Sequence, residues 1–153
     1  DIFYYFFDAE EKRVYISFLA NHGENTPEQI QEESILNERK RKLISNEIWK
    51  ELDHQGDTAE MNPSEIKVIC KLFNPSGPGT WYIYDFDRAC PDRLWIFANL
   101  GDPEMAECGT IFLSELAEFT GPFGLGIERD IHYVPGSKTL QEVIDLIKSG
   151  GHV

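Results

Sequence analysis

The feature that most constrains the fold is a series of short β runs between residues 66 and 113, separated only by turns. These runs are rich in β-branched and aromatic residues, and they comprise Ile66–Phe73, Thr80–Phe86, Arg93–Asn99 and Gly109–Leu113. Intervening segments such as NPSGPG and DRACPD supply the Pro, Gly and Asp that favour turns. A parallel sheet needs a crossover of about a dozen or more residues between paired strands. The gaps here are too short, so the sequence predicts an antiparallel sheet.

Helices are predicted on both sides of this series. Thr26, followed by Pro and by Gln29 in capping-box register, is typical of a helix start. We expect this helix to cover much of residues 27–53, with a break near Ser45–Asn46. Thr139 and Glu142 predict a second capping box that opens a C-terminal helix over residues 139–150.

Three smaller elements complete the prediction. Ile2–Phe7 and Val14–Leu19, joined by a polar turn, predict an N-terminal β-hairpin. Ser114 is expected to cap a short helix, and Ile127–Tyr133 to form a fifth β run in the second half of the chain. Residues 1–153 are thus predicted to form a single α+β domain, with an antiparallel sheet of about four to six short strands and flanking helices.

The charge of the chain restricts its partners. The 153 residues carry a formal charge of −13, which repels a nucleic-acid backbone, so direct nucleic-acid binding is not expected. An acidic surface serves either solubility alone or the binding of a basic protein surface. The only basic cluster, Arg39–Lys42, is interpreted as a solvated helix face.

Cysteine content and hydropathy bear on location. Cys70, Cys90 and Cys108 are an odd number without CxxC spacing, which argues against a disulfide framework and a structural zinc site. No apolar run approaches the roughly 20 residues of a membrane span. These patterns predict a cytoplasmic protein without membrane contact. The chain begins at Asp1 rather than Met, which leaves open an accessory domain of a larger protein.

The stretch WYIYDFD contains the first candidate site. On a regular strand, Trp81, Ile83, Asp85 and Asp87 share one side, and Tyr82, Tyr84 and Phe86 share the other. Asp85 and Asp87 form a DxD pair that could bind Mg²⁺ or Mn²⁺. Alternatively, an acidic binding surface is expected that includes Trp81 and six acids, namely Asp85, Asp87, Asp92, Asp102, Glu104 and Glu107. Turns that happen to be acidic, and core packing of the aromatic residues, remain the simpler interpretations.

The stretch GPFGLGIERDIHY contains the second candidate site. Its glycines follow a predicted helix and precede a predicted strand, which is the reverse of a phosphate-binding loop, so they predict a turn. On a strand, Glu128, Asp130 and His132 share a face on which two carboxylates and an imidazole could hold a metal or relay a proton. A solvated face is the alternative. Arg129, on the other face, needs a carboxylate partner if buried and is a candidate binding residue.

Four blocks, LISNEI, VICKLFNPSGPGTWYIYDFD, NLGDPEMAECGTIFLSELAEF and GPFGLGIERDIHY, carry a family resemblance. Over about residues 43–135 the chain resembles a bacterial domain-of-unknown-function family found on plasmids, phages and other mobile elements, sometimes beside antirestriction modules. Residues 1–35 fall outside it, the segment RACPDRLWIFANL is less typical, and the C-terminal helix is at best weakly covered. The resemblance implies a mobile-element setting and no specific reaction.

Function is predicted on these grounds. The charge, the family setting and the absence of motifs such as GxSxG and HExxH favour a non-enzymatic interaction protein of a mobile element or phage. It would act in counter-defence, in an antirestriction-like way, by binding a host protein with a basic surface. In this role it needs no cofactor. The alternative is a small Mg²⁺- or Mn²⁺-dependent enzyme acting on nucleotides or phosphodiesters through Asp85, Asp87, Glu128, Asp130 and His132.

Overall fold

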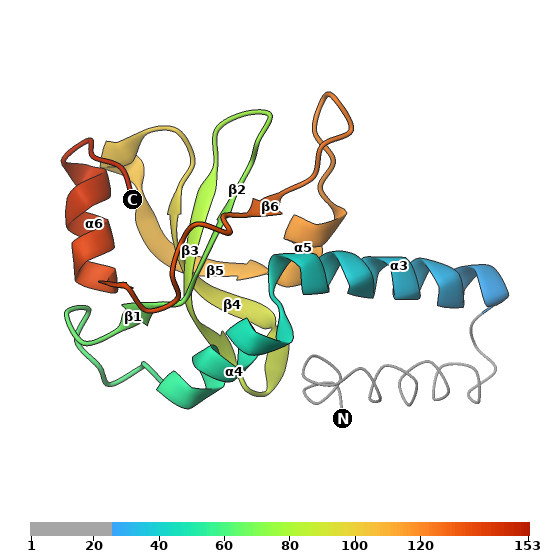
Figure 1. Cartoon of the computed structure of the whole chain (residues 1–153), viewed down its shortest axis with the longest axis horizontal. Coiled ribbons are helices and arrows are strands. Elements are labelled where there is room, and N and C mark those ends of the chain that lie inside the picture. Colours follow the sequence, from blue (N-terminus) through green and yellow to red (C-terminus); the bar gives the residue numbers. More distant parts are fainter. Residues whose placement is uncertain (1–25) are drawn as a thin grey trace.

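The structure, a computed structural model, describes residues 26–153 and confirms the α+β class (Figure 1). A five-stranded antiparallel sheet has the order β5–β4–β3–β2–β6, and β1 pairs with β7 in a separate two-stranded sheet. The strands are β1 (Lys67–Val68), β2 (Cys70–Phe73), β3 (Thr80–Asp87), β4 (Cys90–Asn99), β5 (Glu107–Phe112), β6 (Glu128–Arg129) and β7 (Lys138–Thr139). The helices are α3 (Pro27–Leu43), α4 (Asn46–Gln55), α5 (Leu113–Glu118) and α6 (Leu140–Lys148), with a 3-10 turn η1 (Pro103–Met105). The predicted N-terminal hairpin lies outside the described residues.

Side-chain caps set the helix boundaries as predicted. Thr26 and Gln29 form a reciprocal capping box at the start of α3. Ser45 accepts a hydrogen bond from the Ile48 N–H and begins α4, which confirms the predicted break. Thr139 and Glu142 form the capping box of α6. Each cap satisfies backbone N–H groups that have no partner within the helix.

The predicted cap at Ser114 is wrong. Strand β5 continues directly into α5, which begins at Leu113 without a side-chain cap from its own N-cap residue. Ser114 instead donates from its N–H and its hydroxyl to the Asp92 carboxylate, at 3.1 and 2.6 Å. Asp92 of the neighbouring strand β4 therefore accepts a hydrogen bond from the first turn of α5, in place of a local cap. Asp92 is distant from α5 in the sequence, so local sequence does not predict this contact.

Helices cover both faces of the sheet. On one face, α4 and the end of α3 contribute Leu43, Ile44, Ile48, Trp49 and Leu52, which pack with α5 and with sheet residues such as Ile83 and Leu94. Trp49 meets Phe86 edge to face, with ring centroids 5.1 Å apart. On the other face, Leu140, Val143 and Ile147 of α6 pack with Tyr82 and Phe97. Figure 1 shows α6 and α4 on separate sides of the molecule. No helix of residues 26–153 is long and apolar enough to cross a membrane.

The expected alternation along β3 fails at a β-bulge. Ile83 pairs with Ile96, but the next partner pair is Asp85 with Trp95, so Tyr84 is an extra residue on β3. A bulge shifts the following side chains by one position. Phe86 consequently packs in the cluster of Trp49 and Ile83, not in that of Tyr82 and Tyr84.

Two other predicted runs are shorter than expected. Ile66–Phe73 is divided into β1 and β2, which belong to different sheets. Of Ile127–Tyr133, only Glu128–Arg129 is a strand. The Asp130 carboxylate accepts from the His132 N–H at 2.9 Å, and this local turn ends the strand because it diverts the backbone from the ladder. Asp130 and His132 therefore do not continue a strand face shared with Glu128.

Candidate functional site

The carboxylate of Asp85 is enclosed by the protein. The residue is 2% exposed, and its Oδ2 accepts from the N–H and the hydroxyl of Thr58 at 3.0 and 2.7 Å. Its Oδ1 accepts from the Phe86 N–H and from Arg88 Nη1 at 2.8 and 2.7 Å. This acid therefore ties the loop after α4 to the end of β3, and it is not part of an exposed acidic surface.

The other residues predicted with Asp85 have local structural contacts. Asp87 accepts from the Ala89 N–H in the turn between β3 and β4. Asp92 is half-buried between Ser114 and Lys40, whose Nζ lies 3.1 Å from its Oδ1. Trp81 packs against the core and over Gly79, where an added Cβ would lie 2.8 Å from the ring.

Glu128 and the Asp85–Asp87 pair lie at opposite ends of β3, and Asp130 lies beside Lys71, whose partner on β3 is Tyr82. Glu128 pairs with Phe73, which pairs with Thr80 at the first residue of β3. Asp85 and Asp87 stand near the last residue of the same strand. In the described part of the chain, no group of three or more His, Cys, Asp and Glu is placed to hold a metal ion. The geometry thus brings together no Mg²⁺ or Mn²⁺ site from these residues.

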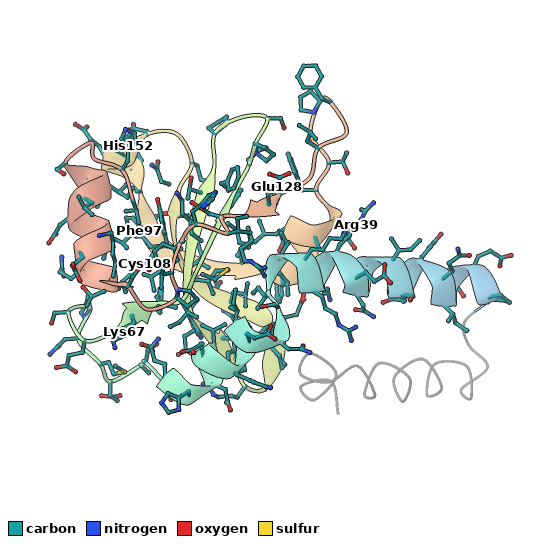
Figure 2. All side chains as sticks on the ribbon, in the orientation of Figure 1. Arg39, Lys67, Phe97, Cys108, Glu128 and His152 are labelled. Atoms are coloured by element: carbon teal, nitrogen blue, oxygen red, sulfur yellow. The ribbon has the colours of Figure 1, made fainter. Side chains whose placement is uncertain are left out.

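The structure does bring the second predicted stretch together with the basic cluster. A pocket of about 880 Å³ lies between α3, α5, the loop after α5, and β6, and we call it the β6 pocket. Its basic residues are Arg39, Lys42, Lys71 and Arg129, and its acidic residues are Glu128 and Asp130. Apolar walls come from Leu43, Phe73, Ala117, Phe119 and Ile127, and His132 completes one side. Figure 2 labels Arg39 on α3 and Glu128 beside β6, which both line it.

Charges in the β6 pocket are unevenly paired. Lys71 Nζ lies 3.1 Å from Asp130 Oδ2 and also donates to the Val153 carbonyl at 2.9 Å. Burial raises the pKa of Asp130, but the hydrogen bonds from Lys71 and the His132 N–H outweigh this and hold it below its ordinary value. Arg129 Nη1 lies 3.5 Å from the Leu43 carbonyl at the end of α3. Arg39, Lys42 and Arg129 form no ion pair with any carboxylate of residues 26–153.

The prediction that Arg39–Lys42 is a solvated helix face agrees with the exposure of Arg39 and Lys42, but these residues have further contacts. Lys40 pairs with Asp92, whereas Arg39 and Lys42 border the pocket. The sequence carried a signal for this: Arg39 and Lys42 are three apart, and with Leu43 they lie on one face of a helix. Leu43 is buried, so these two exposed cations flank a side chain that packs into the protein.

A second hollow lies along β4 and β5, and its volume is about 280 Å³. We call it the β5 groove. Its lining includes Ile96, Leu100, Met105 and Gly109, with the acids Asp102 and Glu107, and no basic residue from the described part of the chain. Leu100 and Met105 are 64% and 75% exposed. Strand β5 pairs with β4 alone among the described strands, and its residues are mostly exposed. Sequence reasoning noticed the acids of this region but not the apolar side chains among them.

Together these features define a small α+β protein with an antiparallel sheet, a basic pocket at one sheet edge and an acidic, apolar groove at the other. The chain belongs to the family described as "Protein of unknown function (DUF2958)", which matches residues 43–153. The match includes the C-terminal helix that the sequence resemblance covered weakly. Comparison with curated proteins and with solved structures gave no match.

Proposed function

We propose that this protein is a non-enzymatic interaction protein that binds a basic segment of a host protein along the β5 edge of its sheet. The observation that carries this proposal is the β5 groove. It combines exposed apolar side chains with acidic ones, at a strand edge whose backbone groups pair with no further strand of residues 26–153. An extended peptide adds to such an edge through main-chain hydrogen bonds.

Charge complementarity selects the partner. The protein carries −13, and the charged residues that line the groove are the acids Asp102 and Glu107. Only every second side chain of an added strand faces the groove, so the residues at those positions should include both Lys or Arg and aliphatic residues to match a groove that is acidic and apolar. The groove replaces Asp85 and Asp92 as the proposed contact surface, since those two acids are held by internal partners.

The proposed setting is a mobile element or phage, with a role in counter-defence. It is supported by the sequence resemblance and by the acidic charge, which suits binding to proteins that themselves bind nucleic acid. Gene neighbourhoods test the setting: we expect family members beside plasmid, phage and antirestriction genes. Family members placed consistently among chromosomal housekeeping genes would contradict it.

Selection from a random peptide-display library on the full chain tests the binding proposal. We expect enriched peptides to carry basic and aliphatic residues two positions apart, on one face of a strand, and their binding to weaken as salt rises because exposed charges are screened. Glu107→Lys reverses a charge in the groove and should weaken these peptides about tenfold, as expected for a favourable charge contact converted to repulsion. Gly109→Val should weaken them as well, because an added Cβ at Gly109 enters open space above the groove.

Glu60→Lys is the matched control, since Glu60 is exposed, lies outside the groove and gives the same change in net charge. It should leave selected peptides within about twofold of wild type once long-range effects are screened. Enrichment of acidic peptides, or equal losses for the two lysine substitutions, would contradict the proposal.

A further inference from the structure

We infer that the β6 pocket binds a small organic phosphate that has an apolar or aromatic body, the chemical class to which nucleotides belong. This inference concerns the opposite edge of the sheet from the β5 groove and does not depend on the proposed function. It rests on the side chains of the pocket, and not on the glycine loop, whose order in the chain is unlike that of a phosphate-binding loop.

Charge is the first argument. In a chain of net charge −13, three cations that pair with no carboxylate of residues 26–153 converge on one hollow, from α3 and from β6. Arg39 and Lys42 stand on the same face of α3, and Arg129 is directed to the end of that helix by its contact with the Leu43 carbonyl. Lys71 is neutralised by Asp130, so Glu128 alone opposes these three charges. The pocket is thus positive within an acidic protein, which concentrates anions at this place.

Shape and lining give the second argument. A volume of about 880 Å³ lies within the range of small-molecule sites, which hold apolar walls and a few placed polar groups. Phe73 and Phe119 offer ring surface for a planar body, and Leu43 and Ile127 complete the wall. Two arginines present planar forks of N–H donors that match phosphate oxygens.

The wall that faces α3 is held in shape by internal contacts. The Gly121 N–H donates to the Leu125 carbonyl at 2.7 Å, and this closes the loop after α5. Gly121 also lies against Ser76 of the β2–β3 turn so closely that an added Cβ would meet its hydroxyl. Because the loop rests on the sheet, the pocket exists before a ligand arrives, which lowers the entropic cost of binding.

Calorimetric titration of the full chain at low salt tests the inference, with phenyl phosphate and AMP as probes. Their uncharged counterparts, phenol and adenosine, show whether the phosphate is required. We expect both phosphates to bind and both counterparts to bind at least about tenfold more weakly, because the counterparts lack charge-assisted hydrogen bonds to the arginines. In ¹⁵N-resolved spectra, AMP should shift amides of residues 39–43 and 126–132.

Lys42→Glu and Arg39→Glu should each weaken AMP binding about tenfold or more. Lys50→Glu is the matched control, because Lys50 is exposed on α4, lies outside the pocket and gives the same charge change as Lys42→Glu. Circular dichroism shows that each variant is folded before titration. Absence of binding by both phosphates, binding of adenosine equal to that of AMP, or equal losses for Lys42→Glu and Lys50→Glu would overturn the inference. Glu107→Lys should leave AMP binding intact, which separates this test from that of the proposed function.

Discussion

Thr58 and Asp85 are joined by two hydrogen bonds in the interior, from the Thr58 N–H and hydroxyl to Asp85 Oδ2, at 3.0 and 2.7 Å. Both residues are buried. The contact fixes the loop after α4 against the bulged end of β3. Asp85, which the sequence suggests as a metal ligand or a surface charge, is therefore a structural residue. Its removal should lower the stability of the protein.

Asp85→Ala is expected to lower the free energy of unfolding by about 2–4 kcal/mol. The reason is that the donors of Thr58 and Arg88 lose the carboxylate that accepts their hydrogen bonds. Asp87→Ala is the control on the same strand. It removes one hydrogen bond in an exposed turn and should cost about 1 kcal/mol or less. Urea unfolding followed by tryptophan fluorescence measures both. Equal losses for the two variants would contradict a structural role specific to Asp85.

The Lys71–Asp130 pair predicts a pH dependence of stability. The folded-state pKa of Asp130 lies below its ordinary value of 3.8, so near that pH the unfolded chain binds more protons. The stabilisation is present above the unfolded pKa and is lost as pH falls through the folded one. The difference in unfolding free energy between wild type and Asp130→Asn should thus be constant from pH 7 to about pH 5 and shrink below pH 4. A difference unchanged down to pH 3 would refute the pairing.

The three cysteines should differ in reactivity. Burial raises the pKa of the Cys70 thiol to about 12, and its Sγ lies 3.7 Å from the Leu43 carbonyl. Cys90 and Cys108 are both exposed residues, but partial burial of the Cys108 thiol raises its pKa. Since the thiolate is the reactive form, a disulfide reagent at pH 8 should label Cys90 first, Cys108 more slowly and Cys70 only with global unfolding. Early labelling of Cys70, seen by mass spectrometry, would contradict the packing of β2.

Gly79 and Gly109 predict opposite responses to alanine. Gly79 has φ +128°, and a Cβ there would lie 2.8 Å from the Trp81 ring. Gly79→Ala should therefore destabilise by about 1–3 kcal/mol. At Gly109 the Cβ meets nothing within 4 Å, and loss of backbone freedom in the unfolded chain makes Gly109→Ala neutral or stabilising by up to about 1 kcal/mol. Thermal unfolding compares the two, and a similar loss at both sites would argue against the described β2–β3 turn.

Local signals predicted much of this fold. Caps at Thr26, Ser45 and Thr139 set helix starts because a side-chain oxygen meets N–H groups only a few residues away. Alternation located most strands of the sheet. The bulge at Tyr84 depends on pairing with β4, and the first turn of α5 bonds to Asp92 instead of being capped by Ser114. Both features involve partners distant in sequence, so periodicity alone does not predict them.

The candidate sites were less predictable. The turn at Asp130 breaks the alternation that would have aligned Glu128 with His132, and its carboxylate is used by Lys71. The β6 pocket unites Arg39 and Arg129, which are far apart in the chain and meet only because β6 joins the sheet beside α3. The two arginines are brought together by the topology of the fold, so the spacing of residues in the sequence does not predict that they line one pocket.

Mapping a library-selected basic peptide onto the ¹⁵N-labelled protein tests the central claim most directly. The account predicts chemical-shift changes that are concentrated in β5 and in residues 100–105. It also predicts that β5 amides exchange more slowly with solvent in the complex, and that Glu107→Lys abolishes both effects. Shifts concentrated elsewhere, or a complex that leaves β5 amide exchange unchanged, would contradict the β5 edge as the binding surface.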